Sequence, residues 1–173
     1  TGTNGKTTSK ELINSVLSSE LNCYATKGNL NNHIGVPLSL LEINSKHEIA
    51  IIEMGANHQK EIESLCNIAK PTHGVITNIG AAHLEGFKNL DGVIKTKNEL
   101  YQFIAKNKGH LFVNAEDRLL LNLSSTVEKT TYGYKGNISG KINTATPLLQ
   151  INYKGNVIKS QLIGNFQHTN IML

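Results

Sequence analysis

The sequence has few aromatic residues, few cysteines and no long hydrophobic run. Aromatic side chains make up 5% of its 173 residues, and the lysines behind its formal charge of +4 are scattered along the chain. A nucleic-acid groove combines clustered basic residues with aromatic platforms, so this composition favours small anionic ligands over nucleic acid. No apolar segment is long enough to cross a membrane, and no secretory signal is present.

The two cysteines lie far apart. Cys23 is in a segment typical of a strand, and Cys66 is in one typical of a helix. A disulfide framework or a zinc site needs more cysteines at closer spacing. This usage fits a reducing cytoplasm, so we expect a cytoplasmic protein without membrane insertion.

Short apolar segments alternate with segments of helical periodicity along most of the chain. This alternation predicts an α/β fold, a doubly wound and mostly parallel sheet with helices on both faces. The expected strands are residues 22–26, 47–54, 73–78 and 110–114, and the expected helices are residues 6–20, 37–43, 58–70, 90–106 and 116–124. From residue 129 to 163 the turn-rich pattern instead predicts a small β-hairpin subdomain.

The first residues, TGTNGKTTSKELI, form a glycine-rich turn that leads into an amphipathic helix. Glycines allow backbone N–H groups to turn inward, and the positive end of a helix points at the same place, which favours a phosphate. As in P-loops, Lys6 would reach the β- and γ-phosphates and the Thr7 hydroxyl would bind Mg²⁺. The predicted nucleotide contacts are Gly2, Thr3, Asn4, Gly5, Lys6, Thr7 and Thr8. A plain glycine-rich helix start with a solvated lysine is the alternative, because the first glycine of the strict pattern would precede Thr1.

Polar residues follow several of the expected strands, where ligands bind in a doubly wound sheet. Glu53 ends a hydrophobic strand, and a buried carboxylate there needs a cationic partner such as a magnesium-nucleotide. His83 follows the next strand, and Asn114 ends the fourth. His33 lies in the Asn-rich loop after the strand at residues 22–26. Spacing alone leaves each of these a candidate ligand or an ordinary loop residue.

Five sequence blocks in order, TGTNGKTT, ATKGNLNNHIGVPLSLL, IIEMGANHQKEI, ITNIGAAHLEGFKNLDGVIKTKNELY and FVNAED, resemble the Mur ligase family. The resemblance implies that Thr7 and Glu53 bind one magnesium ion and that His83 binds a second. It also implies a lysine carbamylated by carbon dioxide on the following helix, as a further ligand of the second ion. Lys95 and Lys97 could both match, and the family's offset of fourteen residues from His83 selects Lys97.

The resemblance assigns other residues to the substrates. Asn32 and His33 match the place where relatives face the γ-phosphate and the incoming carboxylate, and Asn114 and Asp117 match the segment near adenine and ribose. The last segment departs from the family pattern G-x-H-N-x-x-N, with Phe166 and Gln167 in place of His and Asn. Only its Gly164 and Asn170 agree, so it is left out of the expected site.

The implied activity is ATP-dependent amide-bond formation through an acyl phosphate, with Lys6, Glu53, His83 and Lys97 as the catalytic set. The NNHIGVP and AHLEGF versions of the motifs imply UDP-MurNAc-tripeptide and D-alanyl-D-alanine as substrates, in peptidoglycan precursor synthesis. We expect residues 1–173 to be the central ATP-binding domain of a longer ligase. N-terminal UDP-binding and C-terminal domains would complete that ligase, so the domain alone should be inactive.

Two alternatives remain open. Another Mur ligase or a folylpolyglutamate synthase would share the P-loop, Glu53 and the helix lysine, but not this NNHIGVP and AHLEGF pairing. A non-catalytic nucleotide-binding module would share the P-loop alone. Such a module would have no reason to combine Thr7, Glu53, His83 and a modifiable lysine.

Overall fold

The computed structural model describes residues 1–80, 87 and 89–173. Its parallel strands form two small sheets. In one, β1 (Cys23–Ala25) pairs with β2 (Ile49–Ile51), and in the other β3 (His73–Val75), β4 (His110–Asn114) and β5 (Lys129–Tyr132) are neighbours in that order. The predicted strands are therefore present, although most are shorter than their hydrophobic segments.

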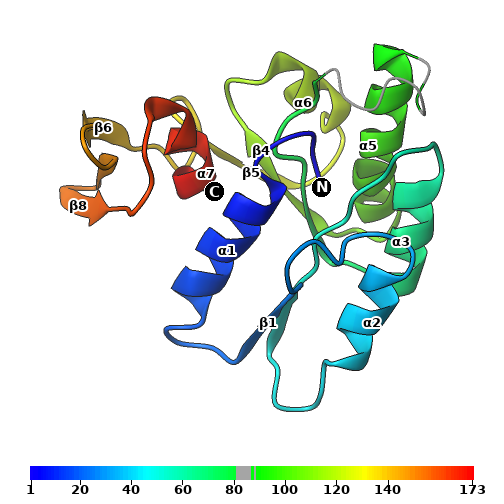
Figure 1. Ribbon diagram of the computed structural model, residues 1–173. Helices are drawn as coiled ribbons and strands as arrows, with labels where there is room; N and C mark the ends of the chain where they lie inside the picture. Colours follow the sequence, from blue (N-terminus) through cyan, green and yellow to red (C-terminus); the bar gives the residue numbers. More distant parts are fainter. Residues whose placement is uncertain (81–86, 88) are drawn as a thin grey trace.

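Helices connect these strands and lie on both sides of them. They are α1 (Lys6–Leu17), α2 (Gly35–Leu41), α3 (Glu61–Ala69), α5 (Leu90–Lys106) and α6 (Arg118–Leu123). Figure 1 shows α2, α3 and α5 gathered on one side of the parallel strands, and α1 on the other. The predicted doubly wound α/β fold is confirmed. None of the helices in the described part of the chain is long and apolar enough to cross a membrane.

The main core lies between the parallel strands and the helices α3, α5 and α6. Ile62 and Ile104 are fully buried on the helices, and Leu111 and Val113 are fully buried on β4. A strand covered on both faces is apolar at successive positions, which explains the continuous hydrophobic runs in the sequence.

The antiparallel part of the chain starts later than expected. The range expected for the β-hairpin subdomain includes Lys129–Tyr132, but this segment is β5, a parallel neighbour of β4. Three of its four residues are only half-buried, because β5 is the last strand of its sheet. It therefore lacks the hydrophobic run that marks the inner strands. The antiparallel sheet consists of β6 (Lys141–Thr144), β7 (Gln150–Tyr153) and β8 (Asn156–Lys159).

The end of the chain returns to α1. A short 3-10 helix, η1 (Asn165–Gln167), leads into α7 (His168–Met172). Figure 1 shows α7 between α1 and the antiparallel sheet. Met172 joins Tyr132, Leu149 and Ile151 in a second, smaller core.

Candidate functional site

The glycine turn at the start of the chain has the backbone conformation that the sequence predicts. Gly5 has a φ of 77° and directly precedes α1, and Gly2 has a φ of 150°. A Cβ on Gly2 would lie 1.9 Å from Thr77 Oγ1, so the turn also approaches its neighbour too closely for any side chain. Both positions therefore require glycine. The turn that they form leads into α1 and places the N-terminal amides of this helix at the carboxyl end of the sheet.

The turn is held by the segment that follows β3. The Thr3 amide donates to the Asn78 carbonyl at 3.0 Å, and the Thr77 amide donates to the Thr1 carbonyl at 3.0 Å. The Asn78 side chain accepts from the Asn4 amide at 2.9 Å and donates to the Asn4 carbonyl at 3.0 Å. Sequence reasoning missed Asn78, although the segment ITNIG carried the signal of a polar residue just after a strand.

Lys6 lies over the turn. Its Nζ donates to the carbonyl oxygens of Gly2 at 3.0 Å and Thr3 at 3.2 Å. These carbonyls hold the ammonium over the turn, beside the amides at the start of α1. A phosphate bound to those amides would lie beside the positive charge of Lys6.

The structure brings Thr7 and Glu53 together. The Thr7 hydroxyl donates to Glu53 Oε2 at 2.9 Å, and Asn31 Nδ2 donates to Glu53 Oε1 at 2.7 Å. Glu53 is 5% exposed, so each of its buried carboxylate oxygens has a donor. Carboxylate and hydroxyl oxygens are the ligands that Mg²⁺ prefers, and the pair lies beside the P-loop.

Asn31 is a second residue that sequence reasoning missed. Its carbonyl accepts from the Gly55 amide at 2.7 Å, so both its backbone and its side chain contact the segment that carries Glu53. The signal was present in GNLNNHIG, but the expectation fell on the next two residues. Asn32 Oδ1 instead accepts from the amide of Ile34 at 3.1 Å and from the amide of Gly35, the first residue of α2, at 2.8 Å. His33 is exposed.

The structure distinguishes the two candidate lysines on α5. Lys95 is exposed, whereas Lys97 is 4% exposed. Burial, helped by the nearby Lys6 ammonium, lowers the pKa of Lys97 from 10.5 to about 8, against the opposing effects of Glu61 and Glu99. His83, the other predicted ligand of a second metal ion, lies outside the described residues.

Asn114 and Asp117 lie at the carboxyl end of β4, on the expected edge of the sheet. Asn114 Oδ1 accepts from the Glu116 amide at 3.0 Å, and Asp117 Oδ1 accepts from the Leu120 amide at 3.1 Å. Asp117 thereby caps the N-terminus of α6. These bonds give the two side chains a local structural role, and their assignment to the nucleotide stays a prediction.

Asn170, from the segment that was left out of the expected site, lies beside the P-loop. Its Oδ1 accepts from Ser9 Oγ at 3.3 Å and is 3.1 Å from the point that a Cβ on Gly5 would occupy. Its Nδ2 donates to Gln167 Oε1 at 2.7 Å. The packing of α7 on α1 therefore brings the end of the chain to the start of the site.

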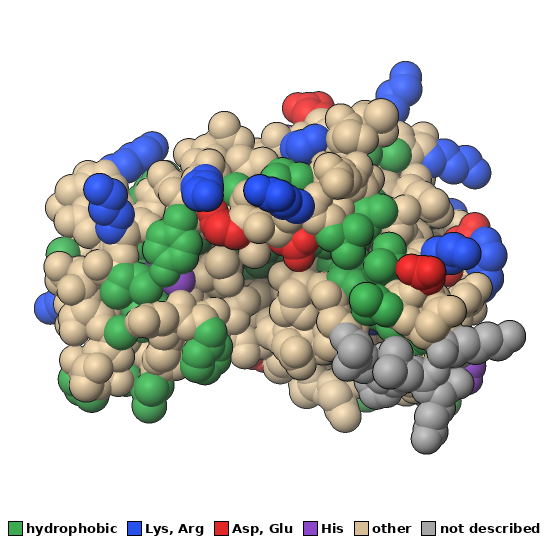
Figure 2. Space-filling view, turned by 90° about the horizontal axis from the view of Figure 1, so that it is seen from above, with side chains coloured by type: hydrophobic (Ala, Val, Ile, Leu, Met, Phe, Trp, Pro, Cys, Tyr) green, Lys and Arg blue, Asp and Glu red, His purple; other side chains and the backbone are tan. Residues whose placement is uncertain are grey.

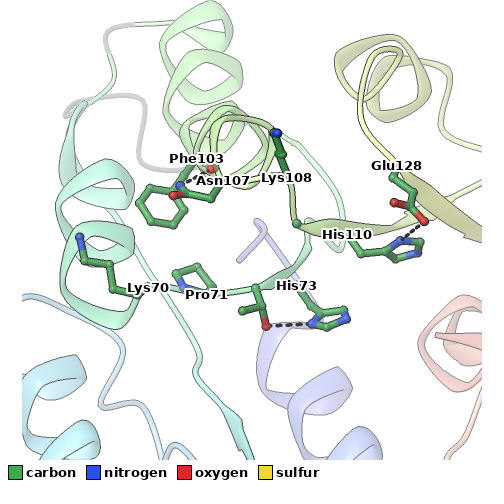
Figure 3. A pocket seen from close by; sticks show the side chains of 10 residues that line it. Lys70, Pro71, His73, Phe103, Asn107, Lys108, His110 and Glu128 are labelled. Atoms are coloured by element: carbon green, nitrogen blue, oxygen red, sulfur yellow. Dashed lines mark hydrogen bonds and ion pairs between the residues drawn. The ribbon is translucent and has the colours of Figure 1, made fainter.

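An open pocket of about 490 Å³ lies at the other end of the sheet, where His73 begins β3 and His110 begins β4 (Figure 3). Lys70 and Lys108 line it. Lys70 directly follows the last residue of α3, and Lys108 lies two residues after the end of α5. Cations at such ends compensate the carbonyl groups of the helices, which gives these lysines a structural reason to be there. The pocket contains none of the predicted site residues.

Figure 2 shows Lys and Arg side chains spread across the face seen there, singly or a few together. This agrees with the scattered lysines of the sequence and differs from the basic stripe typical of nucleic-acid binding.

The full length of the chain, residues 1–173, matches the family described as Mur ligase middle domain. The chain belongs to the Mur ligase family. This Mur ligase domain is 40% identical over 147 residues to the UDP-N-acetylmuramoyl-tripeptide--D-alanyl-D-alanine ligase of Escherichia coli K12, a match that covers 84% of the chain and 32% of the relative. The domain thus spans about a third of that enzyme's length.

Solved structures show the same fold. MurF from Acinetobacter baumannii superposes on 99% of the Mur ligase domain with a TM-score of 0.86 and 31% identity, and the match covers 39% of that protein. MurF ligase from Thermotoga maritima, solved in complex with ADP, superposes on 99% of it with a TM-score of 0.82 and 28% identity, covering 42% of that protein. The fold predicted from the sequence is that of MurF.

Proposed function

We propose that this domain binds ATP and magnesium within a ligase that joins D-alanyl-D-alanine to UDP-MurNAc-tripeptide. The observation that carries the proposal is the contact between Thr7 and Glu53 beside a glycine turn, in a chain 40% identical to a ligase of that name. The site has the donors, the cation and the buried acid that a magnesium-nucleotide requires.

The reaction has two chemical steps. The terminal carboxylate of the tripeptide attacks the γ-phosphorus of ATP, and ADP leaves with the bond electrons. The amine of D-alanyl-D-alanine then attacks the acyl carbon of the acyl phosphate, phosphate leaves, and the amine loses a proton. The products are the amide, ADP and phosphate, and the P-loop contributes mainly position and charge.

Particular residues of the chain would serve the first step. The amides from Gly2 to Thr8 would hold the phosphates, and Lys6 would move from the carbonyls of Gly2 and Thr3 to the phosphate oxygens. Thr7 and Glu53 would hold a magnesium ion, with Asn31 keeping the carboxylate oriented. No group of three His, Cys, Asp or Glu side chains with metal-binding geometry occurs in the described part of the chain. The nucleotide and water would supply the other ligands of the ion.

Lys97 would carry a carbamate. An ammonium has no lone pair for a metal or for carbon dioxide, whereas a neutral amine attacks carbon dioxide and becomes a metal-binding carboxylate-like group. The pKa of Lys97, lowered to about 8, leaves a much larger neutral fraction near neutral pH than a solvated lysine has. With His83, this group would hold the second magnesium ion.

The remaining predicted residues complete the proposal. Asn32 and His33 would face the γ-phosphate and the incoming carboxylate from the start of α2, and Asn114 and Asp117 would lie near adenine and ribose. We propose that parts of the longer ligase outside the matched region bind the UDP end of one substrate and D-alanyl-D-alanine, in a reducing cytoplasm. Closure of those parts over the site would exclude water that hydrolyses acyl phosphates.

The test is phosphate release by the full-length ligase that contains this domain. Release should require UDP-MurNAc-tripeptide and D-alanyl-D-alanine together, and Lys6→Ala should abolish it while circular dichroism shows an intact fold. Dependence on a different amino acid or peptide would assign the domain to another member of the family. Phosphate release that needs neither substrate would contradict the ligase proposal.

A further inference from the structure

Helix α3 is capped by a side chain from another helix. Its N-cap residue is Lys60, which has a φ of 70° and makes no side-chain cap bond. The Lys60 amide donates to Glu99 Oε1 at 2.7 Å, and the Glu63 amide donates to Glu99 Oε2 at 2.9 Å. Glu99 belongs to α5, so its carboxylate joins the middle of one helix to the start of another.

The two hydrogen bonds between Glu99 and the start of α3 are buried and charge-assisted. Glu99 is 8% exposed, and each of its oxygens accepts an amide at the positive end of α3. A carboxylate with two such bonds at a helix N-terminus is stabilised by both charge and geometry. Breaking these hydrogen bonds would leave the buried Glu99 carboxylate without its donors. The contact therefore resists sliding of α5 along α3.

The segment between Glu53 and α3 is also fixed at both ends. At its start, Thr7 and Asn31 hold the Glu53 carboxylate. At its end, Glu61 Oε2 accepts from the Asn57 amide at 2.7 Å and the His58 amide at 3.1 Å. The start of α3 is therefore connected to Glu53 by a segment with little freedom.

Lys97 precedes Glu99 by two residues on α5, close to the point where α5 meets α3. In the first turn of α5, a Cβ on Gly92 would lie 2.0 Å from the Phe87 carbonyl oxygen, so this turn packs closely against the Phe87 backbone. Lys97 Nζ is 6.0 Å from the centre of the Phe87 ring. The position of Lys97 thus depends on where α5 is held.

We infer that Glu99 is a positioning residue for Lys97. By capping α3, it holds α5 at a set distance from the segment that carries Glu53, so the carbamate on Lys97 and the Glu53 carboxylate face the same ATP phosphates. This inference rests on the proposed function, because it gives Glu99 a role only if Lys97 carries the carbamate. A displacement of about 1 Å between reacting groups can reduce a rate by about 100-fold, so the contact matters for rate as well as for folding.

The experiment uses Glu99→Gln in the full-length ligase. A glutamine keeps one acceptor but places an NH₂ group against the second amide, which weakens the cap. We expect kcat to fall by about 100-fold with the KM for ATP nearly unchanged, since the P-loop is untouched. Loss of the Glu99 charge by itself lowers the pKa of Lys97 further and favours the neutral amine. In ¹³C NMR of protein equilibrated with ¹³C-bicarbonate, a weaker carbamate resonance of Lys97 is therefore the sign that α5 has moved, and raised bicarbonate should restore part of kcat.

Glu63→Gln is the matched control. Glu63 is an exposed acid on α3 that pairs with Lys60 at 2.8 Å, so its replacement removes the same charge without removing the cap acceptor. It should leave kcat and the carbamate resonance unchanged. If Glu99→Gln does not fold, Glu99→Asp keeps the charge with a shorter reach, and the same losses in smaller measure are expected.

The outcomes separate this inference from the proposed function. A folded Glu99 variant with a lower unfolding temperature but an unchanged kcat and carbamate resonance would overturn the positioning role alone. Wild-type ligase without a carbamate resonance or any bicarbonate dependence would overturn both the assignment of Lys97 and the role of Glu99. A loss of both properties in Glu63→Gln as well would assign the effect to surface charge and also overturn the inference.

Discussion

The hydroxyl of Thr7 lies 2.9 Å from a carboxylate oxygen of Glu53, although the two residues are 46 positions apart in the chain. The contact joins the first turn of α1 to the segment after β2. Both oxygens are hard ligands that suit Mg²⁺, and the amides that would hold a phosphate belong to the same helix. The Mur ligase domain thus brings its proposed metal-binding and phosphate-binding groups together at one point.

Thr7→Val should weaken magnesium binding. Valine keeps the shape of threonine but has no oxygen, so the ion would lose a ligand and Glu53 Oε2 its donor. We expect the magnesium concentration for half-maximal activity of the full-length ligase to rise by roughly 10 to 100-fold. Thr126→Val, on the exposed turn after α6, is the control and should not change the titration. An unaltered magnesium requirement in Thr7→Val would remove Thr7 from the metal site.

Asn31→Ala should destabilise the fold and the metal site together. The substitution leaves Glu53 Oε1 buried without its donor, at a cost of about 1 to 3 kcal/mol in the free energy of unfolding. Asn29→Ala, in the same loop but exposed, should cost less than about 0.5 kcal/mol. Urea unfolding of both variants without magnesium measures the difference, and equal stabilities would show that the Asn31 contact contributes nothing.

Asn78→Ala should weaken nucleotide binding through the shape of the P-loop. The variant loses both bonds to the Asn4 backbone, so the turn would have to be ordered when the nucleotide binds. A loss of about 1.4 kcal/mol corresponds to a tenfold rise in the dissociation constant of ADP, which titration calorimetry would measure. Asn122→Ala, exposed at the end of α6, provides the comparison. Equal ADP affinity in the two variants would contradict a role for Asn78.

Lys97 should make the stability of the domain depend on pH in the alkaline range. Its pKa is about 8 in the folded state and 10.5 in the unfolded state, so the unfolded chain binds more protons between these values and stability rises with pH. The full penalty, up to roughly 3 kcal/mol, applies below pH 8 and disappears above pH 10.5.

The measurement compares wild type with Lys97→Met in buffer free of carbon dioxide. The variant should be more stable at pH 7.5, and its advantage should shrink steadily towards pH 10.5. Burial raises the pKa of the Cys66 thiol to about 12, which lowers stability over part of the same range, but this effect cancels in the difference. A difference that stays constant with pH would show that Lys97 is not held in its lowered-pKa environment.

Nearby residues were sufficient to predict much of this protein. The glycine turn, Lys6, Thr7 and the amphipathic helix that follows lie within one short stretch, and their conformations depend on local backbone and capping preferences. The alternation of apolar strands and helices also predicted the doubly wound sheet, because strands buried on both faces need continuous apolar runs. Glu53 was found in the same way, as an acid that ends such a run.

Only the tertiary structure decided which polar side chains meet. Asn31 rather than Asn32 contacts Glu53, Asn170 reaches the P-loop from the end of the chain, and Glu99 caps a helix whose N-cap residue lies 39 residues earlier. The strand β5 joined the parallel sheet although its sequence lacked the hydrophobic run of an inner strand. Each of these contacts links segments far apart in sequence. A local pattern can mark a polar residue as a candidate, but its partner depends on how whole helices and strands pack.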